Sequence, residues 1–105
     1  MNAGAVTGIE VTLEYTPLAF IYGLCPAFAI INGVENRTGW GTFFFPVPPG
    51  RYNVACYTNY LFISRCGLNS MDIDIYPGQI VRVTWSAPPI TFMKGAMRAE
   101  VRSSV

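Results

Sequence analysis

The carboxylate pair Asp72 and Asp74 is the pattern in this sequence best suited to chemistry. Two residues apart on a strand, the side chains share one face and lie about 7 Å apart. Such a pair is able to bind a calcium ion or to act as a general acid and base. Alternating polar residues are more often the solvated face of a strand, and we prefer that interpretation. No metal or cofactor is therefore expected.

Other catalytic candidates are scarce. The sequence has no histidine, the commonest general base in enzymes. Serine and cysteine nucleophiles need an activating partner, and the sequence offers no evident one. It also contains no glycine-rich loop of the kind that holds phosphate groups. We therefore expect that the protein is not an enzyme.

The three cysteines, Cys25, Cys56 and Cys66, do not form a zinc motif, because there is no C-x-x-C pair and no histidine. A disulfide between Cys25 and Cys66 is compatible with the sequence. Three buried thiols in a reducing compartment are the interpretation we prefer.

The composition is unusually poor in charge. The chain has seven Lys or Arg and six Asp or Glu among 105 residues, while 51% of it is hydrophobic. A typical domain of this size would carry roughly 26 charged residues. Part of the surface is therefore expected to contact a partner. The net charge of +1, with both signs interspersed, argues against nucleic-acid binding.

Hydrophobic residues alternate with polar ones in four segments, 9–15, 51–54, 71–75 and 81–86, as in half-buried strands. The segment from Lys94 to Val101 is open to either a short helix or a last strand. We predict one domain over residues 1–105, an antiparallel β-sandwich of seven or eight strands, with a barrel as second choice. The expected strands are 6–15, 27–32, 34–36, 41–46, 51–60, 69–76, 79–86 and 96–102.

Turn signals separate these strands. Asn32-Gly33 suits the two central positions of a type I′ hairpin turn. Pro49-Gly50 and Pro77-Gly78 each suit the centre of a type II turn.

Three connections are unexpectedly hydrophobic: 17–24, 60–63 and 89–93. Loops normally lie on the surface and are polar. These segments either fold back over the open ends of the sandwich or form an exposed interaction patch. For Trp40, which lies between two glycines, both alternatives are open: packing over an end of the sandwich or belonging to an exposed patch. The candidate interaction residues are Leu18, Phe20, Ile21, Tyr22, Leu24, Trp40, Tyr60, Leu61, Phe62, Ile63, Ile90, Phe92 and Met93.

No signal peptide is recognisable, and the uncharged stretch 17–31 is too short to span a bilayer. We expect a cytoplasmic protein, with a membrane-peripheral or assembly-bound location as the alternative.

Several segments resemble small uncharacterised β-sandwich proteins of actinobacteria and, more loosely, PEGA-like modules. The resemblance covers roughly residues 27–95 and implies a non-enzymatic module attached to larger machinery. The chain departs from a PEGA module in its hydrophobic segment 17–31. The segments are Gly39–Gly41, VPPGRYNV from Val47, YLFISRCG from Tyr60, MDIDIYPGQ from Met71, and Lys94-Gly95.

The leading functional expectation is a structural or interaction module that assembles through hydrophobic loops and an uncovered sheet face or edge. It would form a homo-oligomer or part of a larger assembly such as a virion. The second hypothesis is peripheral binding to membrane or lipid, with 20–22 and 61–63 as wedges. The third is binding of a small ligand or carbohydrate by Trp40, Tyr57 and Tyr60.

Overall fold

The computed structural model describes residues 6–15, 22–23, 25–60, 63–88 and 94–104. Within these residues the chain forms eight strands and two separate sheets, not a closed barrel. The predicted β-sandwich is thus confirmed. The strands are β1 (Gly8–Glu14), β2 (Ala27–Ile31), β3 (Val34–Arg37), β4 (Gly41–Pro46), β5 (Gly50–Tyr60), β6 (Ile63–Ile75), β7 (Gln79–Ser86) and β8 (Ala96–Ser104).

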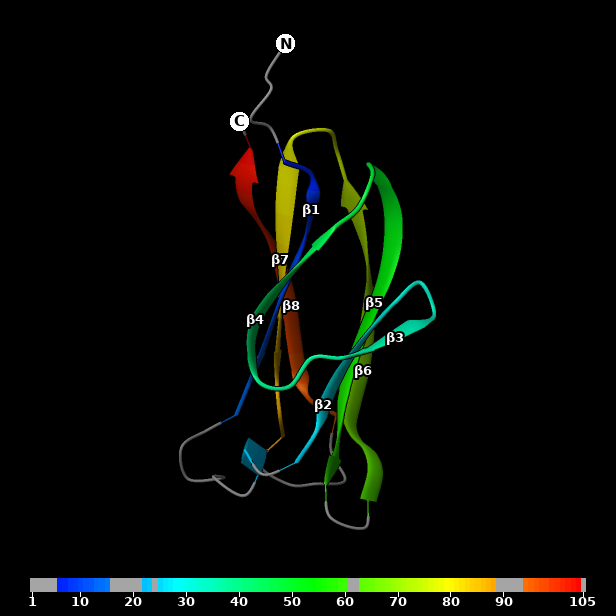
Figure 1. The fold of residues 1–105 in the computed structure, drawn as a ribbon, viewed down its shortest axis with the longest axis vertical. Coiled ribbons are helices and arrows are strands. Elements are labelled where there is room, and N and C mark those ends of the chain that lie inside the picture. Colours follow the sequence, from blue (N-terminus) through cyan, green and yellow to red (C-terminus); the bar gives the residue numbers. More distant parts are fainter. Residues whose placement is uncertain (1–5, 16–21, 24, 61–62, 89–93, 105) are drawn as a thin grey trace.

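Each sheet has four strands, in the order β4-β1-β7-β8 in one and β3-β2-β5-β6 in the other (Figure 1). Strands β3 and β4 are edge strands of different sheets, as are β6 and β8. Neighbouring strands are antiparallel except β1 and β7, which are parallel. The alternation of residue types does not reveal this parallel pair, because it reports burial and not strand direction.

The core lies between the two sheets and follows from the alternation. On β1 and β7 every second residue points inward, while Glu10 and Arg82 form an ion pair on the outer side. Hydrophobic side chains of both sheets then exclude water from the space between them, which is the main stabilising contribution. The inner residues include Ile9, Val11, Leu13, Ala27, Ala29, Ile31, Val54, Cys56, Val81, Val83 and Trp85.

Two of the three predicted turns are confirmed. Asn32 and Gly33 have φ of 48° and 81°, the left-handed values that a type I′ turn needs. Gly78 has φ of 79°, and the Gln79 N–H donates to the Tyr76 carbonyl across the turn. The type II turn at Pro49-Gly50 is wrong. Gly50 has φ of 154° and is already the first residue of β5.

Strand β6 begins six residues earlier than expected, at Ile63 instead of residue 69. Its ladder with β5 shifts register twice, between Cys56 and Thr58 and between Thr58 and Tyr60. Such bulges add unpaired residues and interrupt the two-residue period. The simple alternation therefore could not reveal this half of the strand.

Candidate functional site

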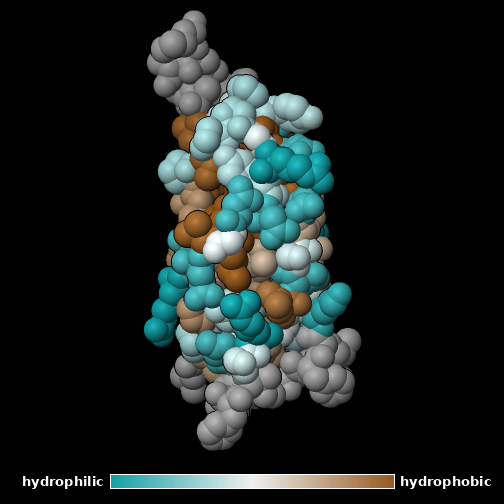
Figure 2. Space-filling view, turned by 90° about the vertical axis from the view of Figure 1, so that its right-hand side faces the viewer, coloured by the Kyte–Doolittle hydropathy of each residue, from teal (hydrophilic) through white to brown (hydrophobic). Residues whose placement is uncertain are grey.

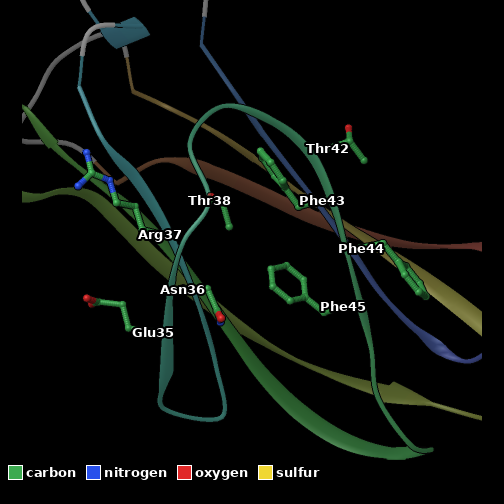
Figure 3. A pocket seen from close by; sticks show the side chains of 8 residues that line it. All are labelled: Glu35, Asn36, Arg37, Thr38, Thr42, Phe43, Phe44 and Phe45. Atoms are coloured by element: carbon green, nitrogen blue, oxygen red, sulfur yellow. The ribbon is translucent and has the colours of Figure 1, made fainter.

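A groove of about 730 Å³ separates the edge strands β3 and β4 on one side of the sandwich (Figure 3). Each of these strands pairs with one neighbour, so each presents an unpaired backbone edge within the described part of the chain. Such edges are templates for pairing with another strand. The groove is lined by Glu35, Asn36, Arg37, Thr38, Thr42, Phe43, Phe44 and Phe45.

Strand β4 supplies the hydrophobic wall of the groove. Figure 3 shows Phe43 and Phe45 pointing from β4 toward β3, whereas Phe44 points to the opposite side. Phe43 and Phe45 are half-buried and pack against the core, and Phe44 is 42% exposed on the outer face. Its ring lies over Gly8, where an added Cβ would come within 2.6 Å of ring atoms. Glycine at this position therefore lets the Phe44 ring lie close to the sheet.

Strand β3 supplies the polar wall. The Asn36 side-chain amide donates to the Val34 carbonyl at 3.1 Å, and Glu35 accepts a hydrogen bond from the Tyr57 hydroxyl. Arg37 lies opposite Phe28 in the ladder of β2 and β3. The groove thus joins an aromatic wall to a wall that carries both signs of charge.

An aromatic stack covers the outer face of the sheet behind β3. The rings of Phe28 and Tyr57 are stacked with centroids 4.8 Å apart, and the Arg65 guanidinium lies 5.1 Å from the Tyr57 centroid. Arg65 has a left-handed φ of 52°, and Asn59 accepts a hydrogen bond from its backbone N–H. On the side of the molecule where β3, β5 and β6 lie, hydrophobic residues form a broken band among hydrophilic ones (Figure 2).

Tyr57 is only 4% exposed, although it lies on the outer face of its sheet. Burial raises the pKa of Tyr57, and the hydrogen bond to the Glu35 carboxylate raises it further. The Phe28 ring stacks on the Tyr57 ring, and the Arg65 guanidinium lies over the Tyr57 ring. Trp40 instead packs with the core, so the structure does not bring Trp40 and Tyr57 together as a platform for a sugar.

Removing the Tyr57 hydroxyl by Tyr57→Phe is expected to lower the free energy of unfolding by about 1 kcal/mol. The substitution removes the hydrogen bond to Glu35 and keeps the stack on Phe28. Urea unfolding of the variant and of wild type measures this change in the free energy of unfolding. Tyr57→Ala, which removes the ring as well as the hydroxyl, is the comparison and is expected to lose more stability. No loss of stability in Tyr57→Phe, with a loss only in Tyr57→Ala, would contradict a role for the hydroxyl.

Four aromatic side chains of the described residues form a cluster at one end of the sandwich. Trp40 is stacked on Trp85 at 5.9 Å, and the Tyr15 ring contacts the Trp40 ring edge-on at 4.9 Å. Tyr22, only 3% exposed, donates its hydroxyl proton to the Pro88 carbonyl at 2.7 Å. Tyr22 and Trp40 thus cap the core. For Tyr22 this corrects the expectation of an exposed interaction residue, because its hydroxyl finds an internal acceptor.

The segments that flank the three hydrophobic connections meet at this same end. The Asn59 N–H donates to the Pro26 carbonyl, and the Ala87 N–H donates to the Glu14 carbonyl. The Gly95 N–H donates to the Gly67 carbonyl, which joins the two sheets. The side chains of Tyr60 and Ile63 lie outside the described part of the structure. The predicted residues Leu18, Phe20, Ile21, Leu24, Leu61, Phe62, Ile90, Phe92 and Met93 also lie outside the described residues.

Asp72 and Asp74 lie on the outer face of β6, and Arg51 bridges them with N–O distances of 3.6 Å to each. The Asn53 side chain donates to Asp72 at 2.9 Å. This hydrogen bond and the Arg51 charge lower the pKa of Asp72. The described residues contain no group of three or more potential metal ligands. The geometry is that of a solvated strand face with a surface ion pair.

All three cysteines are buried. Burial raises the pKa of Cys56 to about 12 and also raises that of Cys66. Cys66 Sγ lies 3.9 Å from the Tyr22 hydroxyl. A raised pKa keeps a thiol protonated and therefore poorly nucleophilic at neutral pH.

Sequence reasoning missed the groove, since none of Phe43, Phe44 and Phe45 was among the candidate residues. The available signal was three consecutive phenylalanines in a predicted strand that has no charged residue. In a strand with one buried face, only every second residue needs to be hydrophobic, so three phenylalanines in a row place at least one ring on the outer face.

Comparisons of the chain with protein-family models, with curated proteins and with solved structures found no match. The resemblance to actinobacterial β-sandwich proteins and to PEGA-like modules therefore stays a prediction. Among the described residues, no helix has the length and hydrophobicity required to cross a membrane.

Proposed function

We propose that this chain is a non-enzymatic structural module that associates with copies of itself, alone or within a larger assembly. The observation that carries the proposal is the character of the β4 edge, meaning the unpaired backbone side of Gly41–Pro46. Its sequence, GTFFFP, contains no charged residue, and its six pairs with β1 run without a register shift.

The other three edge strands carry the features that normally prevent edge-to-edge association. Proteins protect exposed edges with charged side chains, bulges and proline. Of these features β4 has only a proline, at its last residue Pro46. The ladders of β6 with β5 and of β8 with β7 both contain register shifts. The charged residues are Glu35 and Arg37 on β3, Arg65, Asp72 and Asp74 on β6, and Arg98, Glu100 and Arg102 on β8.

Exposed hydrophobic side chains support the same proposal. Phe44 is exposed on β4, and the half-buried Phe43 and Phe45 line the open groove beside it. Burying apolar surface of this kind contributes roughly 25 cal/mol per Å² toward association. The chain has few charged side chains that could keep a surface with these exposed rings soluble without a partner.

Sedimentation velocity over a concentration series tests this function. We expect the weight-average sedimentation coefficient to rise with concentration in the micromolar range, because self-association follows mass action. A coefficient that stays at the monomer value up to hundreds of micromolar would contradict self-assembly.

Peripheral membrane binding is the second candidate. It is favoured by the convergence of the segments that flank the three hydrophobic connections on one end of the sandwich. Liposome flotation of wild type beside Phe62→Asp tests it. Flotation of wild type alone would support this candidate, and flotation of neither protein would remove it.

A further inference from the structure

We propose that two copies of this chain pair antiparallel along their β4 edges, centred on Phe44. This inference rests on the proposed self-association and assigns its surface and register. The pairing would join the two β4-β1-β7-β8 sheets into one continuous sheet of eight strands, with a twofold axis at Phe44. It would give the unpaired backbone groups of both β4 strands hydrogen-bonding partners.

The two faces of the sheet restrict the register. Residues directly opposite each other in an antiparallel pair point to the same face. Phe43 and Phe45 face the core, whereas Thr42 and Phe44 face outward. A continuous sheet must keep these faces aligned, so odd-numbered residues pair with odd and even with even.

Among the registers that remain, one matches aromatic rings at three successive positions. When Phe44 lies opposite Phe44 of the second copy, Phe43 lies opposite Phe45 in both halves of the pair. A shift by two residues in either direction leaves only one pair of phenylalanines. Cross-strand aromatic pairs stabilise antiparallel sheets, so the centred register is favoured.

A second copy fits this edge better than an unrelated strand. The β4 edge has no charge with which to select a partner of opposite sign. Its three central residues are identical, so the segment is complementary to itself about Phe44. The groove beside Phe43 and Phe45 leaves room for the same two rings of the second copy. An unrelated peptide strand would lack this threefold match unless it carried the same aromatic run.

Phe44→Lys tests the proposed surface. The substitution places two lysines directly opposite each other at the twofold axis, and like charges there destabilise the pair. We expect dimerisation to weaken at least tenfold in sedimentation velocity. Val101→Lys is the matched control, since Val101 is 56% exposed and lies on β8, the opposite edge of the same sheet. It is expected to dimerise like wild type. Circular dichroism of both variants checks that the sandwich is folded.

Disulfide trapping tests the register. Phe44→Cys lies opposite itself across the axis and is expected to form a covalent dimer rapidly under mild oxidation. Thr42→Cys is the control on the same strand and face, because its counterpart is four residues away, roughly 14 Å along the strand. A disulfide needs Cα atoms within about 7 Å. The native cysteines are buried and give little background.

The outcomes separate this inference from the proposed function. If wild type associates and Phe44→Lys associates equally well, the β4 pairing is overturned and the proposed self-association is not. Trapping of Thr42→Cys as fast as Phe44→Cys overturns the register. A wild-type chain that is monomeric throughout overturns both. The proposal is supported if Phe44→Lys loses association while Val101→Lys keeps it, and if Phe44→Cys is trapped as a dimer while Thr42→Cys is not.

Discussion

Trp85→Ala is expected to lower the free energy of unfolding by about 3–5 kcal/mol, the range for truncating a large buried aromatic residue. The Trp85 side chain is 0% exposed and is the largest fully buried side chain among the described residues. Its indole N–H donates to the Gly67 carbonyl at 2.9 Å, so truncation also removes one of the two hydrogen bonds that this carbonyl accepts, the other being from the Gly95 N–H. A domain of this size has only about 5–15 kcal/mol of stability, so the variant would be marginally folded.

Trp40→Ala is the comparison for this prediction, because Trp40 is stacked on the same ring but is only half-buried. Urea unfolding followed by circular dichroism measures both variants. We expect the smaller loss from Trp40→Ala. A Trp85→Ala variant that loses no more stability than Trp40→Ala would contradict the larger contribution expected from the fully buried Trp85 side chain.

Alkaline pH is expected to destabilise the protein through Cys56. The pKa of this thiol is about 12 in the folded chain, against an ordinary value of 9.0, because burial disfavours the thiolate. Between these values the unfolded chain loses the proton and the folded chain keeps it. The free energy of unfolding therefore falls as the pH rises through this window. The full loss amounts to roughly 4 kcal/mol.

Cys56→Ala separates this contribution from others. The variant lacks the titrating thiol, so its stability is expected to fall less steeply between pH 9 and pH 12. Some decline remains, because burial also raises the pKa of Cys66 and Tyr57. Urea unfolding at a series of pH values measures the slopes. Identical slopes for variant and wild type would rule out Cys56 as the cause.

The strands were largely predictable because alternation reports burial directly. The bounds of β7 agree with the sequence prediction, 79–86, and its residues alternate. The bounds of β4 also agree, 41–46, although its three phenylalanines do not alternate. The first half of β6 was not predictable, since its bulges and the left-handed Arg65 break the period. The type II turn at Pro49-Gly50 was wrong because a Pro-Gly pair also suits the start of a strand.

The candidate site was harder to predict, because an edge is a property of strand order. Phe43–Phe45 lies in a strand that sequence reasoning found, but its edge position follows from the pairing of β1 with β7. That pairing is parallel and joins segments about 70 residues apart, which no local pattern encodes. Tyr22 shows the opposite error. The hydrophobic segment around Tyr22 suggested contact with another molecule, but the Tyr22 hydroxyl donates a hydrogen bond to the Pro88 carbonyl of the same chain.

Isotope-filtered NMR on a mixture of labelled and unlabelled chains most directly tests whether two copies associate through β4. Nuclear Overhauser contacts between labelled and unlabelled protons arise only between different molecules. We expect them between the Phe43 and Phe45 rings of different copies, and between the two Phe44 rings. Intermolecular contacts confined to other surfaces, with none from 43–45, would contradict the account.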